Sequence, residues 1–112
     1  MRSVYFMPLA WEHLGWWVLN DLKMVRKIYQ LLHNSAKTPF EGLGKPEPLI
    51  ANYSGYWSRR INLEHRIVYK VENDKIVVHS LYGHYQDYII YKKNAPISRG
   101  VLGFQFYIRC FV

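Results

Sequence analysis

Residues 56–85, YWSRRINLEHRIVYKVENDKIVVHSLYGHY, decide the fold because they contain three strand-like runs in close succession. The runs are YWSRRI from Tyr56, HRIVYKV from His65 and IVVHSLYGHY from Ile76, and each is rich in β-branched and aromatic residues. Only the short polar segments NLE and ENDK separate them, and such segments are typical of turns. The stretch therefore predicts an antiparallel meander.

Two helices are expected upstream of the meander. Residues 3–7 form a short apolar run that we interpret as a strand, and Pro8 suits the first position of a helix. Apolar residues then recur at helical spacing, at Trp11, Leu14 and Val18. A second helix can be capped by Asn20 or Asp21 and is expected to end near Asn34.

The second helix has a clear apolar stripe. The stripe consists of Val25, Ile28, Leu31 and Leu32, and the residues expected to face water are Lys23, Arg26 and Lys27. Helices followed by a meander predict a compact α+β domain, with an antiparallel twisted sheet and the two N-terminal helices packed on one face.

Composition limits the classes of function. The 112 residues carry 15 Lys plus Arg against 8 Asp plus Glu, for a formal charge of +7, and half of them are hydrophobic. This is one small folded domain whose charge favours a polyanionic partner such as nucleic acid. A single cysteine, Cys110, excludes an internal disulfide framework. With no signal segment and no run of about 20 apolar residues, we expect a cytoplasmic protein with no membrane partner.

The arginines of the first hairpin are candidates for anion binding. If the turn at residues 62–64 pairs Ile61 with His65, Arg60 lies directly opposite Arg66 on one face of the sheet. Like charges there repel unless an anion lies between them, either the carboxylate of Glu47 or a phosphate. The alternative, which spacing alone favours, is that Arg59 joins these two arginines on a solvated sheet face with weak surface ion pairs.

The five histidines have no metal-binding spacing, and we expect neither a metal nor a cofactor. His13 and His33 are expected on helix surfaces, and His79 is expected to be a hydrogen-bonded core or interface residue. His84, in the sequence GHY, is a candidate general acid that could protonate a leaving alkoxide, while Glu47 could accept a proton from an attacking hydroxyl. With an arginine to meet the charge on the phosphorane, these groups meet the requirements of metal-independent RNA cleavage by the ribose 2′-OH.

Three segments carry a resemblance to a known family. TPFEGLGKPEPL (38–49), SGYWSRRINLEHRIVYKV (54–71) and YGHY (82–85) resemble the YoeB/Txe branch of the RelE-type bacterial toxins, and the likeness runs from about Trp11 to Tyr85. It implies a RelE-like fold and a ribosome-dependent endoribonuclease that cuts mRNA in the ribosomal A site. It also implies a YefM-like antitoxin as partner, contact with operator DNA only through the antitoxin complex, and a homodimer.

The resemblance assigns roles to individual residues. It implies Glu47 as general base, Arg66 as the phosphate-steadying cation, His84 as general acid and Tyr85 as a substrate-positioning residue. The residues expected to bind messenger or ribosomal RNA are Lys45, Arg59 and Arg60.

The sequence departs from the family pattern at two places. Ile50 stands where members commonly carry a basic residue, and residues 86–112 extend beyond the His-Tyr pair at which related toxins end. We therefore expect a toxin domain over residues 1–85, an atypical extension over 86–112, and reduced or altered nuclease activity. The alternative is a catalytically impaired module that binds its antitoxin without cutting RNA. A toxin acting on a protein such as a topoisomerase is disfavoured because the acid, base and arginine are all present.

Overall fold

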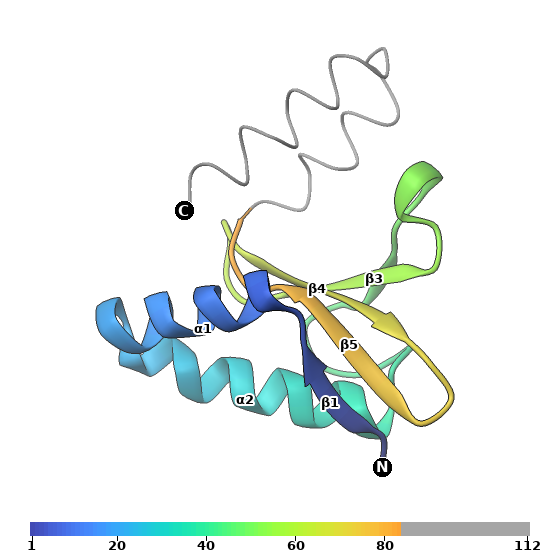
Figure 1. The fold of residues 1–112 in the computed structure, drawn as a ribbon, viewed down its shortest axis with the longest axis horizontal. Helices are drawn as coiled ribbons and strands as arrows, with labels where there is room; N and C mark the ends of the chain where they lie inside the picture. Colours follow the sequence, from blue (N-terminus) through green and yellow to red (C-terminus); the bar gives the residue numbers. More distant parts are fainter. Residues whose placement is uncertain (84–112) are drawn as a thin grey trace.

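The computed structural model describes residues 1–83, so the predictions for His84, Tyr85 and residues 86–112 lie outside the described residues. Figure 1 shows the element order, which is β1 (Ser3–Phe6), α1 (Pro8–Asn20), α2 (Leu22–Lys37), β2 (Glu47–Pro48), the 3₁₀ helix η1 (Ala51–Tyr53), β3 (Tyr56–Arg60), β4 (Arg66–Val71) and β5 (Lys75–Ser80). The short first strand, the two helices and the three-stranded meander are confirmed.

The five strands form one mixed sheet in the order β1-β5-β4-β3-β2. Strands β3 to β5 pair antiparallel, as predicted. The short strand β2, which the sequence did not predict, pairs antiparallel with β3, and β1 pairs parallel with β5, with Ser3 opposite Lys75. A parallel pair needs a long connection, and here most of the domain separates the two strands along the chain. The pattern of neighbouring apolar runs therefore could not reveal this pairing.

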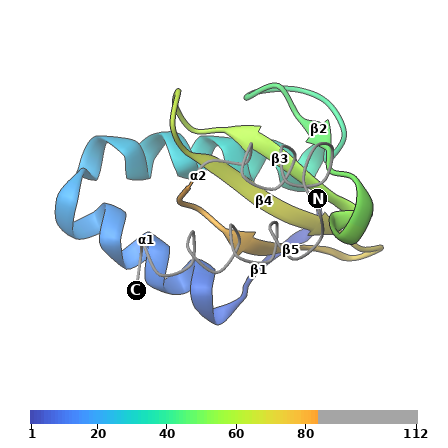
Figure 2. The ribbon, with the colours of Figure 1, turned by 90° about the horizontal axis from the view of Figure 1, so that it is seen from above.

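Both helices pack on one face of the sheet (Figure 1), and Figure 2 shows the same ribbon from above, with the two helices lying beside each other. The core between helices and sheet consists of Ala10, Trp17, Ile28, Leu31, Leu32, Ile61, Ile67, Tyr69, Ile76, Val78 and Leu81. Each large side chain buried there stabilises the fold by roughly 1.5–3 kcal/mol before the loss of conformational entropy is counted.

Helix α2 follows the predicted stripe, because Ile28, Leu31 and Leu32 are buried and its lysines and arginine are exposed. It continues to Lys37, beyond the end expected near Asn34. Asp21 is the N-cap residue, as one of the two predicted alternatives, although its side chain makes no capping hydrogen bond.

The buried face of α1 differs from the predicted one. The structure buries Ala10, His13 and Trp17, whereas Trp11 is 65% exposed and Val18 is 47% exposed. Both sets of residues have helical spacing, and α1 is apolar on most of its circumference, so spacing alone could not fix which face is buried.

Candidate active site

The register of β3 and β4 places two arginines opposite each other, as the sequence predicted. Arg60 pairs with Arg66, and the N–H of Ile61 donates to the carbonyl of His65 at 2.9 Å where the hairpin closes. Side chains alternate between the two faces of a strand, and both Ile61 and Ile67 belong to the core under the helices. Arg60 and Arg66 therefore project from the face of the sheet away from the helices.

Glu47 shares this face. Strand β2 pairs with β3 so that Glu47 lies opposite Ser58, two residues from Arg60 on the same strand. Cross-strand partners face the same way, which makes Glu47 a diagonal neighbour of Arg60, at roughly 7–8 Å in a regular ladder. The register therefore brings a half-buried carboxylate and two guanidinium groups onto one side of the sheet.

The hairpin turn holds the guanidinium of Arg66. Its Nη1 donates to the carbonyl of Asn62 at 2.9 Å, and the Arg66 side chain is only 4% exposed. Asn62 in turn organises the turn, since its Oδ1 accepts the N–H groups of Glu64 and His65, each at 2.8 Å. A guanidinium anchored in this way keeps a fixed direction, which suits a group that must meet a phosphate in one orientation.

Arg60 adds a donor that needs an acceptor. Its Nε is buried and has no hydrogen-bond partner among residues 1–83. At the end of β3, Arg60 also borders a hollow of about 360 Å³ with Lys27 of α2 and Lys45 of the loop before β2, so this hollow lies next to α2 and not on the face shared with Glu47 and Arg66. The buried donor without a partner favours an anion beside Nε of Arg60, and the three cations around the hollow favour an anion there as well.

The loop that carries Lys45 and leads into Glu47 of β2 is fixed at Gly44. Gly44 has φ +79°, and a Cβ there would lie 2.8 Å from Cδ2 of Leu31. Its carbonyl accepts the N–H of Arg60 at 2.7 Å, which ties the loop to the end of β3. Only glycine meets both the backbone angle and the close approach without strain.

Arg59 is not on the cationic face, which corrects the expectation of a solvated, RNA-binding residue. Its side chain is fully buried, at 0% exposure, and Nε donates to the Tyr69 hydroxyl at 2.9 Å. The guanidinium also donates to the side chain of Asn34 and to three carbonyls, those of Thr38 at 2.6 Å, Glu41 at 3.0 Å and Leu43 at 2.9 Å. Strand alternation turns Arg59 toward the helices, where it holds the loop after α2 instead of a nucleic acid.

The described chain ends beside Arg66. The N–H of Arg66 donates to the carbonyl of Gly83 at 2.9 Å, and the N–H of Gly83 donates to Nδ1 of His65 at 2.9 Å. Gly83 immediately precedes His84 in the sequence. The backbone that leads into the GHY motif is therefore bound at the start of β4, next to the anchored arginine.

His13 is buried, which corrects the expectation of a surface residue. It is 1% exposed, and its Nδ1 accepts the N–H of Leu81 at 3.1 Å. Burial, helped by the charges of His79 and His65, lowers the pKa of His13 from 6.5 to about 4. His13 is therefore neutral near pH 7 and can accept this hydrogen bond.

The other two histidines of the helices and strands are half-buried. His33 stacks on Tyr29 one turn earlier on α2, with ring centroids 5.9 Å apart. Burial lowers the pKa of His79, and its Nε2 has no hydrogen-bond partner within the described part of the chain. The expected burial of His79 is thus confirmed in part, while a hydrogen bond at this nitrogen is not seen.

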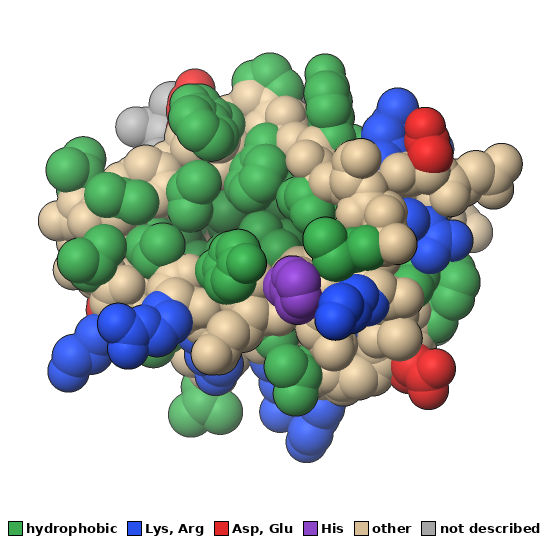
Figure 3. Space-filling model, turned by 90° about the horizontal axis from the view of Figure 1, so that it is seen from below, with side chains coloured by type: hydrophobic (Ala, Val, Ile, Leu, Met, Phe, Trp, Pro, Cys, Tyr) green, Lys and Arg blue, Asp and Glu red, His purple; other side chains and the backbone are tan. Residues whose placement is uncertain are grey.

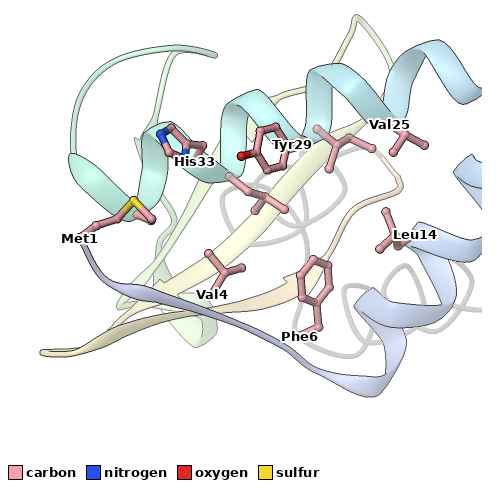
Figure 4. Close-up of a pocket in the computed structure, with 10 residues that line it drawn as sticks. Met1, Val4, Phe6, Leu14, Val25, Tyr29 and His33 are labelled. Carbon is pink, nitrogen blue, oxygen red and sulfur yellow. The ribbon is translucent and has the colours of Figure 1, made fainter.

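A second surface lies on the helix side of the molecule. It is an apolar groove of about 390 Å³ lined by Met1, Val4, Phe6, Leu14, Val25, Ile28, Tyr29, Leu32, His33 and Ala36. Figure 3 shows hydrophobic side chains gathered around a hollow on this side, and Figure 4 shows the groove residues of β1, α1 and α2 facing one another. The groove offers no paired acid and base, so the opposite face of the sheet is the better candidate for catalysis.

Comparison with known proteins gives concordant matches. The sequence model described as YoeB-like toxin of bacterial type II toxin-antitoxin system matches residues 6–85. The chain is 47% identical over 84 residues to Toxin YoeB of Synechocystis sp., covering 75% of this chain and 98% of that protein. It is also 47% identical over 85 residues to Toxin RelK of Mycobacterium tuberculosis, covering 76% of this chain and all of that protein.

Solved structures agree with the sequence matches. A YoeB/ParE toxin from Agrobacterium tumefaciens superposes with a TM-score of 0.72 at 42% identity, covering 74% of this chain and 99% of that one. The YoeB dimer from Staphylococcus aureus superposes with a TM-score of 0.70 at 45% identity, covering 75% and 98%. The YoeB–YefM complex from the same organism gives a TM-score of 0.69 at 43% identity, covering 76% and 99%. Within residues 1–83, no helix has both the length and the apolar character needed to cross a membrane.

Proposed function

The chain belongs to the YoeB-like toxin family of bacterial type II toxin–antitoxin systems, and on this basis we propose that it is a ribosome-dependent mRNA endoribonuclease. The observation that carries the proposal is the gathering of Glu47, Arg60 and Arg66 on one face of the sheet, with Gly83 bound next to Arg66. Cleavage of a phosphodiester by its own ribose hydroxyl needs a base, an acid and a cation, and these residues with His84 supply all three.

The roles follow from chemistry and position. Glu47 removes the proton from the 2′-OH, which attacks the phosphorus, and His84 gives a proton to the departing 5′-oxygen. Arg66, anchored by the carbonyl of Asn62, stabilises the charge that develops on the phosphorane. Tyr85 positions the substrate beside His84.

Arg60, Lys45 and Lys27 hold the RNA backbone in this proposal. They line one hollow at the end of β3, where their positive charges attract a phosphate. Nε of Arg60 is a further donor, without a partner among residues 1–83. Contacts of this kind are independent of base sequence and weaken with salt. Messenger RNA in the ribosomal A site and ribosomal RNA are the proposed nucleic-acid partners.

A YefM-like antitoxin is the proposed protein partner, since a YoeB relative from S. aureus has been solved in a YoeB–YefM complex. Operator DNA is bound only through that complex, and a homodimer is proposed by analogy with the S. aureus YoeB dimer. The site of action is the cytoplasm, where ribosomes and antitoxin are available.

Growth arrest on expression of the full chain tests the proposed catalytic set. We expect Glu47→Ala, Arg66→Ala and His84→Ala each to relieve the arrest while antitoxin capture is retained, because a general acid or base contributes about 100- to 10,000-fold. Trp11→Ala, an exposed position on α1, is the matched control that keeps toxicity. Arrest by all three site variants would exclude this set of residues from catalysis.

The effect of residues 86–112 is tested separately by comparing translation arrest by the full chain and by a version that ends at Tyr85. We propose that the extension reduces or alters activity, because 85 residues of this chain already span the whole of Toxin RelK of M. tuberculosis, and residues 86–112 follow directly after the His-Tyr pair. Equal potency of the two versions would remove this part of the proposal.

A further inference from the structure

Two side chains of α1 bind the backbone of a single residue near the end of the described chain. Nδ1 of His13 accepts the N–H of Leu81 at 3.1 Å, and Nε1 of Trp17 donates to the Leu81 carbonyl at 2.8 Å. His13, Trp17 and Leu81 are all buried, so water cannot reach these polar groups and the hydrogen bonds between them satisfy donors and acceptors that would otherwise have no partner. Leu81 lies just after β5 ends at Ser80, and side chains therefore hold backbone groups that no strand partner holds.

A third side chain binds the backbone of Gly83, two residues after Leu81. Nδ1 of His65 accepts the N–H of Gly83 at 2.9 Å, and the carbonyl of Gly83 accepts the N–H of Arg66 at 2.9 Å. Both backbone groups of Gly83 are thus held by consecutive residues at the start of β4. We call the three side chains of His13, Trp17 and His65 the clamp.

The residue between the two held positions is fixed by aromatic packing. The ring of Tyr82 lies 4.1 Å from the ring of His65 and 4.5 Å from that of Trp16, measured between centroids. It also lies 5.7 Å from the ring of Trp17, so a clamp residue holds Tyr82 as well. Residues 81–83 are therefore fixed one by one, although they belong to neither a helix nor a strand.

We propose that His13, Trp17 and His65 are positioning residues for RNA cleavage, acting by holding the backbone that leads into His84 next to Arg66. The inference rests on the proposed function, because it concerns the geometry of the general acid. A displacement of about 1 Å at a reacting group can cost on the order of 100-fold in rate. Loss of one neutral hydrogen bond changes the folding equilibrium by only about 5-fold. A positioning role thus predicts a loss of rate that exceeds the loss of stability.

The first test measures single-turnover mRNA cleavage on saturating ribosomes with the full chain. We expect His65→Leu, which lacks the acceptor, to cleave about 10- to 100-fold more slowly while its ribosome affinity stays within about 2-fold. His65→Asn loses the ring but offers Oδ1 to the N–H of Gly83, and we expect it to recover cleavage to within about 3-fold of the parent. His33→Leu, on α2, is the matched control with parental rate.

A second variant covers the case in which His65→Leu does not fold. Trp17→Phe keeps an aromatic ring in the core but removes the donor to the Leu81 carbonyl, and Trp11→Phe is its exposed control on the same helix. We expect only Trp17→Phe to reduce the cleavage rate at saturation. Parental rates in a folded His65→Leu or Trp17→Phe variant would overturn the positioning role.

Amide hydrogen exchange separates this inference from the proposed function. In His65→Leu we expect the amide of Gly83 to lose protection at least 10-fold, while the amide of Val78 within β5 keeps its protection. If the parent chain cuts no RNA, the proposed function fails, and the exchange result alone then decides whether the clamp holds the chain. Unchanged protection of Gly83 would overturn the clamp itself.

Discussion

Replacing Arg59 by methionine removes the most extensively hydrogen-bonded charge in the described structure while keeping most of its stem. The guanidinium makes five hydrogen bonds, to two side chains and three carbonyls of the loop after α2. Each buried acceptor left without its donor costs about 1–3 kcal/mol, which applies to the Tyr69 hydroxyl, Asn34 Oδ1 and the Thr38 carbonyl, whereas Glu41 and Leu43 are exposed residues whose carbonyls can regain water. We therefore expect unfolding free energy to fall by about 4 kcal/mol, and the melting temperature by roughly 15–30 °C.

Urea unfolding followed by tryptophan fluorescence measures this loss, with Arg26→Met as the control. Arg26 is exposed on α2, so the same change of charge there should alter stability by no more than about 0.5 kcal/mol. Arg59→Lys keeps the charge but cannot span five acceptors, and we expect it to lose at least about 2 kcal/mol. A loss below about 1 kcal/mol in Arg59→Met would refute the view that Arg59 holds this loop.

Three further expectations concern the site and its support. The pKa of His13 is about 4 in the folded chain against 6.5 in the unfolded chain. The neutral ring therefore contributes fully to the free energy of unfolding above pH 6.5, and up to roughly 3 kcal/mol of that free energy is lost as the pH falls toward 4. In His13→Asn the free energy of unfolding should depend less on pH in that window. Gly44→Ala should destabilise the fold by about 1–3 kcal/mol in thermal unfolding, because φ is +79° and Leu31 lies in the way. Lys27→Ala should weaken ribosome binding and reduce its salt dependence, leaving the saturated cleavage rate unchanged.

The parts of the fold that rest on local patterns could be predicted from the sequence. The stripe of α2, the three strands of the meander and the opposition of Arg60 and Arg66 follow from spacing and from one turn, and the structure confirms each. The resemblance to the YoeB/Txe family was carried by long motifs, and the comparisons confirm it.

Features that depend on distant partners could not be predicted. Arg59 is next to Arg60 in the sequence, and the sequence pattern does not indicate that five acceptors from α2, β4 and the loop after α2 surround Arg59. His13 and Trp17 bind a backbone 64 to 68 residues away, so α1 appeared amphipathic in the wrong phase. One signal was available, since strand alternation from Ile61 already turns Arg59 inward.

Cleavage of a defined mRNA on purified ribosomes, with the ends of the fragments identified, tests the central claim most directly. The full chain should cut only ribosome-bound message and leave a 2′,3′-cyclic phosphate on one fragment and a 5′-hydroxyl on the other, because the ribose hydroxyl is the nucleophile. Glu47→Gln and His84→Ala should each slow this reaction by about 100- to 10,000-fold. Cleavage that leaves 5′-phosphate ends, or that proceeds at the parental rate in both variants, would contradict the account.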